Sequence, residues 1–262
     1  MNPSKFIITN LFISKKLPVY LNCRTKSTAR YNLYAAVTHC IFDLDGTILD
    51  NQQSIDMANK EIFDMYHLQY TPEWRYKLMG KTCKSMWETV INELSLEECT
   101  WQKLDLEHSQ LYDKYLMGAQ LKPGVATLLQ HLHKNNIPMA AVTSSSQLMM
   151  KKKTSHIKEL MAMFSFIVCG DDPKLINSKP SGEIFTICKG CFKDNPPSQS
   201  CLVFENTPVG VLAAENASMK VVGISSVLTP FSSLRRADKV LNHFNEFKPE
   251  DYGLPSFSEV IH

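Results

Sequence analysis

The stretch that decides the fold is Cys40-Ile-Phe-Asp-Leu-Asp-Gly-Thr-Ile-Leu-Asp50. An apolar run ends here in two carboxylates one residue apart, Asp43 and Asp45, followed by Gly46 and Thr47. Asp and Gly are good turn residues, so the plainest interpretation is an acidic corner after a strand. A buried strand would instead bring both acids to the carboxyl edge of an α/β sheet, where ligands bind. Adjacent carboxylates repel each other unless a cation or proton relieves them, which suits metal-assisted chemistry in which one acid attacks and the other moves a proton.

Bulk composition narrows the class of protein. The chain has 262 residues, 44% of them hydrophobic and 21% charged, as in an ordinary globular protein of one large or two small domains. No apolar run approaches the ~18 residues that a membrane span needs. Residues 1–42 carry six basic residues and no acid, which leaves 22 basic and 26 acidic residues in the remainder. This mildly acidic body predicts no binding to nucleic acid, and the lack of a long apolar run predicts no membrane partner. The chain is expected to be a monomer or weak dimer.

The first 37 residues are predicted to form a basic leader or extension. Their composition, basic and free of acids, resembles a mitochondrial presequence. Pro3 and Pro18 interrupt a helix there, and the basic residues do not fall on one face. Two fates therefore stay open: import into the mitochondrial matrix, or a disordered or loosely packed extension of a cytoplasmic protein.

The eight cysteines do not form a disulfide pattern. Cys40, Cys169 and Cys201 sit inside apolar, strand-like runs, which is typical of reduced, buried thiols in an intracellular protein. Cys188 and Cys191 form a lone Cys-x-x-Cys with no second pair, and we expect them on a helix rather than at a metal.

Residues 51–119 are predicted to form an all-helical cap. Apolar residues recur there at three- and four-residue spacing, as in Ile55, Ala58 and Ile62, and no strand-like alternation appears. Thr71-Pro72 and the stretch 95–98 are interpreted as helix starts.

Strands and helices alternate through the rest of the chain. Strands are predicted at 38–42, 139–142, 166–169, 201–204 and 220–224, and helices at 124–135, 147–163, 181–191 and 208–216. Such alternation predicts an α/β protein with a doubly wound parallel sheet. Its core would comprise residues 38–50 and 120–262, with the helical cap inserted after the first strand.

Three further polar sites follow predicted strands or precede helices. Thr143 and Ser144 offer a hydroxyl and backbone N–H groups that could hold a phosphate oxygen, or could cap the next helix, and both roles can coexist. Lys179, before Pro180, would alone be interpreted as a solvated lysine. Glu205 and Asn206 end an apolar strand, as an ordinary loop also would.

The order and spacing of these four sites resemble the four motifs of the haloacid dehalogenase-like hydrolases. Within that superfamily the chain is most similar to the animal pseudouridine-5′-phosphatase group. The stretches that carry this similarity span about residues 38–258 and include 40–50, 121–124, 143–145, 153–156, 170–173, 179–180, 201–205 and 252–256.

The resemblance implies a role for each matching residue. Asp43 would be the nucleophile that forms an aspartyl-phosphate, and Asp45 the general acid and base. Thr143, the Ser144 backbone and Lys179 would hold the phosphoryl group. Mg²⁺ would bind one Asp43 oxygen, the Asp45 carbonyl and an acid of the fourth motif, an oxygen-only set that suits this ion. Phosphoryl transfer independently needs such positioning and charge neutralisation.

The chain departs from the pattern at three places. Asn206 stands where the group usually has a metal-binding Asp, and Glu205 could compensate for the lost charge. Ser178 replaces a Gly, and Asn51-Gln52 replaces Thr-Glu. The expected activity is Mg²⁺-dependent hydrolysis of pseudouridine 5′-phosphate, or else of glycerol 3-phosphate or another polyol or sugar phosphate. The competing interpretation, based on Asn206, is a catalytically weakened relative that serves as a phosphometabolite-binding or interaction protein.

Overall fold

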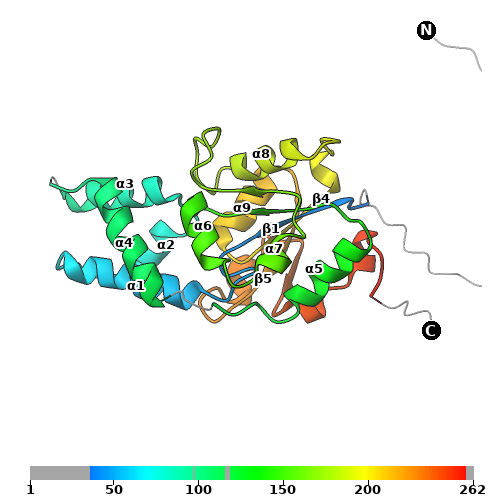
Figure 1. Ribbon diagram of the computed structural model, residues 1–262, viewed down its shortest axis with the longest axis horizontal. Helices are drawn as coiled ribbons and strands as arrows, with labels where there is room; N and C mark the ends of the chain where they lie inside the picture. Colours follow the sequence, from blue (N-terminus) through cyan, green and yellow to red (C-terminus); the bar gives the residue numbers. More distant parts are fainter. Residues whose placement is uncertain (1–35, 97, 116–118, 258–262) are drawn as a thin grey trace, which may run out of the picture. The chain divides into compact units, whose positions relative to one another are not determined.

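The computed structural model describes residues 36–257 except 97 and 116–118, all within the unit Tyr34–His262 (Figure 1). Nearly all of the predicted leader therefore lies outside the described residues. Val37, assigned to that leader, is buried, and its N–H donates to the Tyr252 carbonyl at 3.0 Å. The folded body thus begins by residue 37.

Six parallel strands form one sheet in the order β3-β2-β1-β4-β5-β6. The strands are β1 (His39–Asp43), β2 (Met139–Val142), β3 (Ile167–Val168), β4 (Cys201–Glu205), β5 (Lys220–Ile224) and β6 (Lys239–Leu241). The predicted doubly wound parallel sheet is confirmed. The short strand β6, whose first two residues are only half-buried, was not predicted, because three residues carry too little periodicity.

Helices cover both faces of the sheet, as its alternating side chains require. Cys40 and Phe42 pack in one cluster with α5 (Val125–Lys134). Ile41 packs on the other face with α8 (Glu183–Cys191) and α9 (Pro208–Asn216). In Figure 1, α8 and α9 lie on one side of the strands and α5 on the other. Cys188 and Cys191 lie on α8, as predicted, and both are free thiols.

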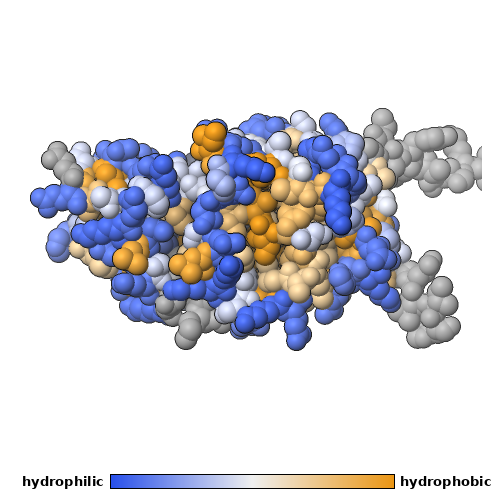
Figure 2. Space-filling model, turned by 45° about the horizontal axis from the view of Figure 1, so that its top comes forward, coloured by the Kyte–Doolittle hydropathy of each residue, from blue (hydrophilic) through white to orange (hydrophobic). Residues whose placement is uncertain are grey.

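Four helices lie between β1 and α5: α1 (Gln52–Met65), α2 (Pro72–Leu78), α3 (Cys83–Leu94) and α4 (Trp101–Tyr115). They share a hydrophobic cluster of their own around Phe63, Trp87 and Leu104. The predicted helical character of this segment is confirmed, whereas the boundaries 51 and 119 stay a prediction. On the face in Figure 2, hydrophilic residues cover most of these helices, with hydrophobic ones scattered among them.

Of the two predicted helix starts, at Thr71 and Ser95, the first is confirmed and the second is wrong. The Thr71 hydroxyl accepts from the Trp74 N–H and caps α2, as expected. Ser95 does not start a helix: it ends α3 in the left-handed region at φ 51°, and α4 begins at Trp101. The cap of α4 is Thr100, whose hydroxyl accepts from the Lys103 N–H at 3.3 Å.

The prediction of one continuous helix over 147–163 is wrong. It divides into α6 (Gln147–Lys153) and the short α7 (Lys158–Met161). The Thr154 hydroxyl donates back to the Met150 carbonyl at 2.8 Å, and such local bonds compete with helix propagation.

Among the described residues, no helix is long and apolar enough to cross a membrane.

Candidate active site

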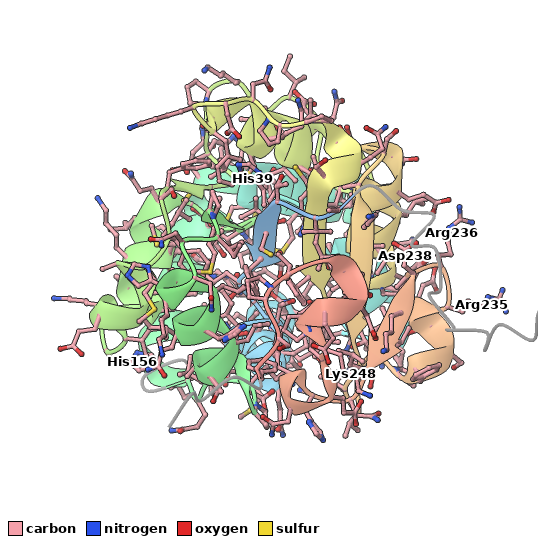
Figure 3. The ribbon with its side chains drawn as sticks, turned by 90° about the vertical axis from the view of Figure 1, so that its right-hand side faces the viewer. His39, His156, Arg235, Arg236, Asp238 and Lys248 are labelled. Atoms are coloured by element: carbon pink, nitrogen blue, oxygen red, sulfur yellow. The ribbon has the colours of Figure 1, made fainter. Side chains whose placement is uncertain are left out.

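The turn after β1 brings both acids to the carboxyl edge of the sheet. Figure 3 views the opposite edge, where His39 begins β1, so Asp43 and Asp45 lie at the far end of that strand. Gly46 has φ +81°, and a Cβ there would come within 2.0 Å of Asn206 Nδ2, so only glycine fits. Asn51 supports the turn by accepting from the Gly46 N–H at 2.9 Å and donating to Asp45 Oδ1 at 2.6 Å. The departure at Asn51 therefore has a structural use.

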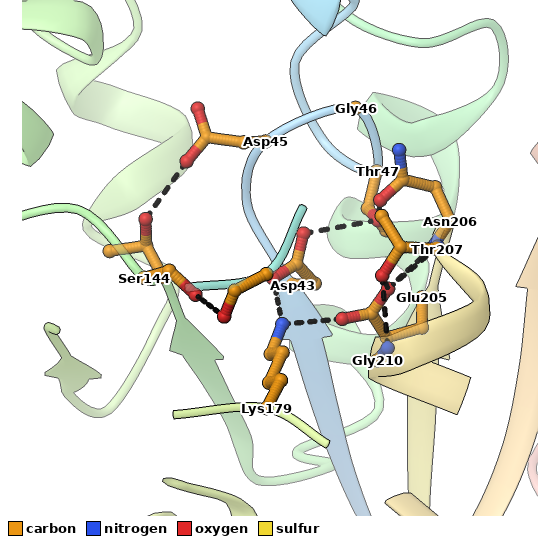
Figure 4. A network of polar contacts seen from close by, with 12 residues as sticks. Asp43, Asp45, Gly46, Thr47, Ser144, Lys179, Glu205, Asn206, Thr207 and Gly210 are labelled. Carbon is orange, nitrogen blue, oxygen red and sulfur yellow. Dashed lines mark hydrogen bonds and ion pairs between the residues drawn. The ribbon is translucent and has the colours of Figure 1, made fainter. Parts of the chain in front are cut away.

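Lys179 links the carboxylates of the first and fourth motifs (Figure 4). Its Nζ lies 2.7 Å from Asp43 Oδ1 and also contacts Glu205 Oε1. Glu205 is fully buried, and its Oε2 accepts from the backbone N–H groups of Asn206 and Thr207 and from the Thr207 hydroxyl at 2.8, 2.9 and 3.0 Å. Both Glu205 oxygens are thus engaged. The lysine expected to be solvated in isolation is instead buried at this site.

Charge and burial oppose each other in this network. Burial raises the pKa of Asp43 to about 7, with Lys179 opposing the rise and Glu205 adding to it. Burial would lower the pKa of Lys179, but the two carboxylates hold it above its usual value. Lys179 is therefore a cation beside the Asp43 carboxyl, where it favours the ionised form of that group.

Asp45 is held by a second buried lysine, Lys153 on α6. The Lys153 Nζ contacts Asp45 Oδ2. It also donates a hydrogen bond to the Ser145 hydroxyl at 2.7 Å. The Thr143 hydroxyl also donates to Asp45 Oδ2, at 2.9 Å. Burial would raise the pKa of Asp45, but Lys153, with hydrogen bonds from Asn51 and Thr143, holds it below its usual value. Asp45 is therefore an oriented, ionised carboxylate.

Two serines join the core to the helical insertion. The Ser144 hydroxyl donates at 3.0 Å to the carbonyl of Gly80, in the loop between α2 and α3. The Thr82 N–H donates to the Ser178 hydroxyl at 3.3 Å. The departure at Ser178 thus provides a contact that a glycine could not make.

One pocket joins these groups. Asp43, Asp45, Ser144, Ser145 and Lys179 line it from the core, and residues of α1, α2, α3 and α4 line it from the insertion. Thr143 is fully buried behind Asp45 and lies outside the pocket lining. Of the residues predicted to hold phosphate, Ser144 and Lys179 therefore reach the pocket, and the Thr143 hydroxyl faces Asp45 instead.

The donor set for Mg²⁺ is weaker than the usual one. In the described part of the chain, no three His, Cys, Asp or Glu side chains converge to hold a metal ion. Glu205 is committed to Lys179 and the backbone, which leaves Asp43, the Asp45 carbonyl and Asn206. The Asn206 Oδ1 accepts from the Thr47 hydroxyl at 3.2 Å, while its buried Nδ2 has no partner.

A half-turn of the Asn206 amide would resolve that mismatch. The Thr47 hydroxyl, 3.4 Å from Asp43 Oδ2, could then accept from Nδ2 and give its single proton to Asp43. The amide oxygen would take the place of the unpartnered Nδ2, beside Gly46. These residues fit a hard dication with one carboxylate ligand rather than two.

The sequence predicted which motif residues meet here, with the exception of Lys153. That residue was part of a stretch that carried the family resemblance but received no role. It ends a run of three lysines, of which Lys151 and Lys152 are exposed, so composition alone indicated a solvated face. Its one signal was its position on the apolar side of α6, three and four residues from Met150 and Met149.

The comparisons with known proteins agree with this geometry. The family model for haloacid dehalogenase-like hydrolases matches residues 40–224, and the chain belongs to this family. A probable pseudouridine-5′-phosphatase of Drosophila melanogaster is 34% identical over 85% of this chain and 96% of that protein. A (DL)-glycerol-3-phosphatase of Arabidopsis thaliana is 31% identical over 86% of this chain and 94% of that protein. With such relatives, the chain is a phosphoric monoester hydrolase.

Solved structures show the same fold. A β-phosphoglucomutase of Clostridium difficile superimposes with a TM-score of 0.70 at 24% identity, over 83% of this chain and 97% of that one. At that identity the likeness concerns the fold alone.

Proposed function

We propose that this protein is a Mg²⁺-dependent phosphatase that hydrolyses a small phosphorylated metabolite through an aspartyl-phosphate. One observation carries the proposal: the pocket brings Asp43, paired with the cation Lys179, beside the separately oriented acid Asp45. A nucleophile, a neutralising cation and a proton-transfer group are the parts that phosphoryl transfer requires.

In the first step, the ionised Asp43 attacks phosphorus, and an Asp43 O–P bond forms as the ester P–O bond breaks. Asp45 gives a proton to the departing oxygen. The charge of the entering phosphoryl group raises the pKa of Asp45 and so favours the protonated form that this step needs. Lys179 and the Ser144 backbone hold the phosphoryl oxygens.

In the second step, Asp45 accepts a proton from water, which attacks phosphorus and releases phosphate and Asp43. The contacts from Asn51, Thr143 and Lys153 keep Asp45 oriented for both transfers. A bound Mg²⁺, held by Asp43, the Asp45 carbonyl and Asn206, would supply further neutralisation of phosphoryl charge.

The proposed substrate is pseudouridine 5′-phosphate, with glycerol 3-phosphate as the second candidate. Each is the compound that names one of the two relatives described above. Asn206 supports a separate alternative, a weakened enzyme that binds a phosphometabolite without turning it over.

The test is release of inorganic phosphate by the purified chain from both compounds and from an aryl phosphate, with Mg²⁺ and with EDTA. The proposal expects Mg²⁺-dependent release, fastest from pseudouridine 5′-phosphate. Preference for glycerol 3-phosphate would transfer the assignment to the polyol. Absence of release from every phosphate at high Mg²⁺ would overturn the enzymatic proposal in favour of the binding protein.

We place the enzyme in the cytoplasm, with the mitochondrial matrix as the alternative that the basic leader supports. Fusion of residues 1–36 to a fluorescent reporter separates the two, because only an import signal would bring the reporter into mitochondria.

A further inference from the structure

The helical insertion contributes a second group of polar side chains to the active-site pocket. Asp56 and Asn59 come from α1, Tyr70 from the segment before α2, and Arg75 from α2, and all four line the same pocket as Asp43 and Asp45. We refer to these four residues as the cap polar cluster. The mechanism above uses none of them.

The cap polar cluster is internally ordered. The Tyr70 hydroxyl donates to Asp56 Oδ1 at 3.0 Å, and Asn59 Nδ2 donates to the Tyr70 oxygen at 3.4 Å. Arg75 Nε lies 2.6 Å from Asp56 Oδ2 as an ion pair, without the alignment of a hydrogen bond. These contacts fix the four side chains before a ligand arrives.

Hydrogen-bonding capacity is left unused within this ordered group. Asn59 is 4% exposed, and its Oδ1 is buried without a partner. Asp56 Oδ2 and Arg75 Nε form an ion pair but lack an aligned hydrogen bond. A buried acceptor without a donor is costly, so natural proteins keep one mainly where something else supplies the donor.

We propose that the cap polar cluster recognises the leaving group of the substrate, and that this group is a flat heterocycle with an N–H beside a C=O, as in an amide or imide edge. The ring N–H donates to Asn59 Oδ1, and the neighbouring carbonyl accepts from Arg75. This inference rests on the proposed function, because it assumes that the phosphoryl end of the ligand lies at Asp43.

The apolar walls of the pocket favour a ring over a polyol. Ile55, Leu78, Met79, Met86 and Met149 line them with apolar surface. Apolar walls with a few placed polar groups suit the faces and edge of a heterocycle. A polyol would leave these walls against hydroxyl groups that need hydrogen bonds.

Two variants test the cluster, and one serves as a control. Asn59→Ala removes the free acceptor. Arg75→Lys keeps a charge beside Asp56 but loses the planar fork that a carbonyl would meet. Asn92→Ala, at an exposed position of α3 outside the pocket, is the matched control. The kcat/KM of each variant is measured with pseudouridine 5′-phosphate and with glycerol 3-phosphate, which has no ring.

We expect Asn59→Ala and Arg75→Lys to lower kcat/KM for the nucleotide by about tenfold or more, the equivalent of one lost hydrogen bond. Their kcat/KM for glycerol 3-phosphate should stay within about twofold of wild type, since that substrate has neither the ring N–H nor the carbonyl that the cluster would contact. Asn92→Ala should match wild type on both. An equal loss on both substrates, or no loss on the nucleotide, would overturn the inference.

Binding of the unphosphorylated nucleoside separates this inference from the proposed function. Pseudouridine and uridine should raise the melting temperature of wild type and not that of Asn59→Ala. If the nucleosides bind in this way but no phosphate ester is hydrolysed, the inference stands and the proposed phosphatase activity fails. If phosphate is released but neither nucleoside binds wild type, the activity stands and the inference fails.

Discussion

Replacing Lys153 by Met should destabilise the fold through Asp45. The Lys153 side chain is 1% exposed and that of Asp45 is 18% exposed, so the ion pair is largely removed from water. Breaking a buried pair by removing one partner costs about 3–5 kcal/mol, because the other charge stays buried without compensation. Since Asp45 retains some contact with water, we expect a loss of about 3 kcal/mol in the free energy of unfolding at pH 7.

The pH dependence of that loss identifies its cause. Lys153 holds the pKa of Asp45 below its usual value, so wild-type Asp45 stays ionised at pH 5. In the variant, burial raises the pKa of Asp45 above that of the unfolded chain. In the variant, the stability contributed by protonated Asp45 is present at low pH and is lost as pH rises through the raised pKa. The difference in unfolding free energy between wild type and Lys153→Met should therefore narrow from pH 7 to pH 5.

Urea unfolding in metal-free buffer at pH 7 and pH 5 measures both effects. Lys151→Met, at an exposed position of the same helix, is the control and should change stability little. If Lys153→Met unfolds at the same urea concentration as Lys151→Met, the ion pair contributes nothing and the reasoning is refuted. A deficit that is equal at the two pH values would assign the loss to packing instead of charge.

Three other variants test the site and the cap. Asp43→Asn should abolish phosphate release without unfolding the chain, as judged by circular dichroism, and near wild-type release would show that Asp43 is not the nucleophile. Asn206→Asp should lower the Mg²⁺ concentration for half-maximal activity about tenfold or more, and should lower the melting temperature in EDTA, because the new carboxylate lies among Asp43 and Glu205; unchanged values for both would mean that residue 206 is not a ligand. Burial lowers the pKa of His108 from 6.5 to about 3, so its contribution to stability is present above pH 6.5 and falls as the pH decreases. His108→Gln should remove up to about 1.4 kcal/mol per pH unit of that fall between pH 6.5 and 5 in urea titrations, and an unchanged slope would contradict this assignment.

The parts of this protein that sequence predicted are those set by local pattern. Apolar runs such as 139–142 and 220–224 gave strands with the observed bounds, because a buried parallel strand is a continuous apolar segment. Parallel topology then brought Asp43, Lys179 and Glu205 to one edge. The motif order was informative because the carboxyl ends of all such strands share that edge.

The unpredicted parts depend on contacts between distant segments. Lys153 contacts Asp45 across 108 positions of sequence, and its spacing from Met149 and Met150 indicates only a buried position, not which residue it pairs with. Arg75 and Asp56 pair between two helices whose relative placement no periodicity specifies. Ser95 was interpreted as a helix start because serine favours that role, whereas its left-handed conformation here ends α3.

The contacts of Ser144 and Ser178 affect how molecules enter and leave the pocket. Ser144 belongs to the loop proposed to hold phosphate, and its hydroxyl also bonds the Gly80 carbonyl of the insertion. Ser178 immediately precedes Lys179, and its hydroxyl accepts from the Thr82 N–H two residues beyond Gly80. An outward swing of the segment 80–82 would therefore break both hydrogen bonds at once. Admission of substrate and departure of product would thus be coupled to Ser144, which is proposed to bind the phosphoryl group, and to the residue next to Lys179, the other residue proposed to bind it, and the rate of opening would set a ceiling on turnover.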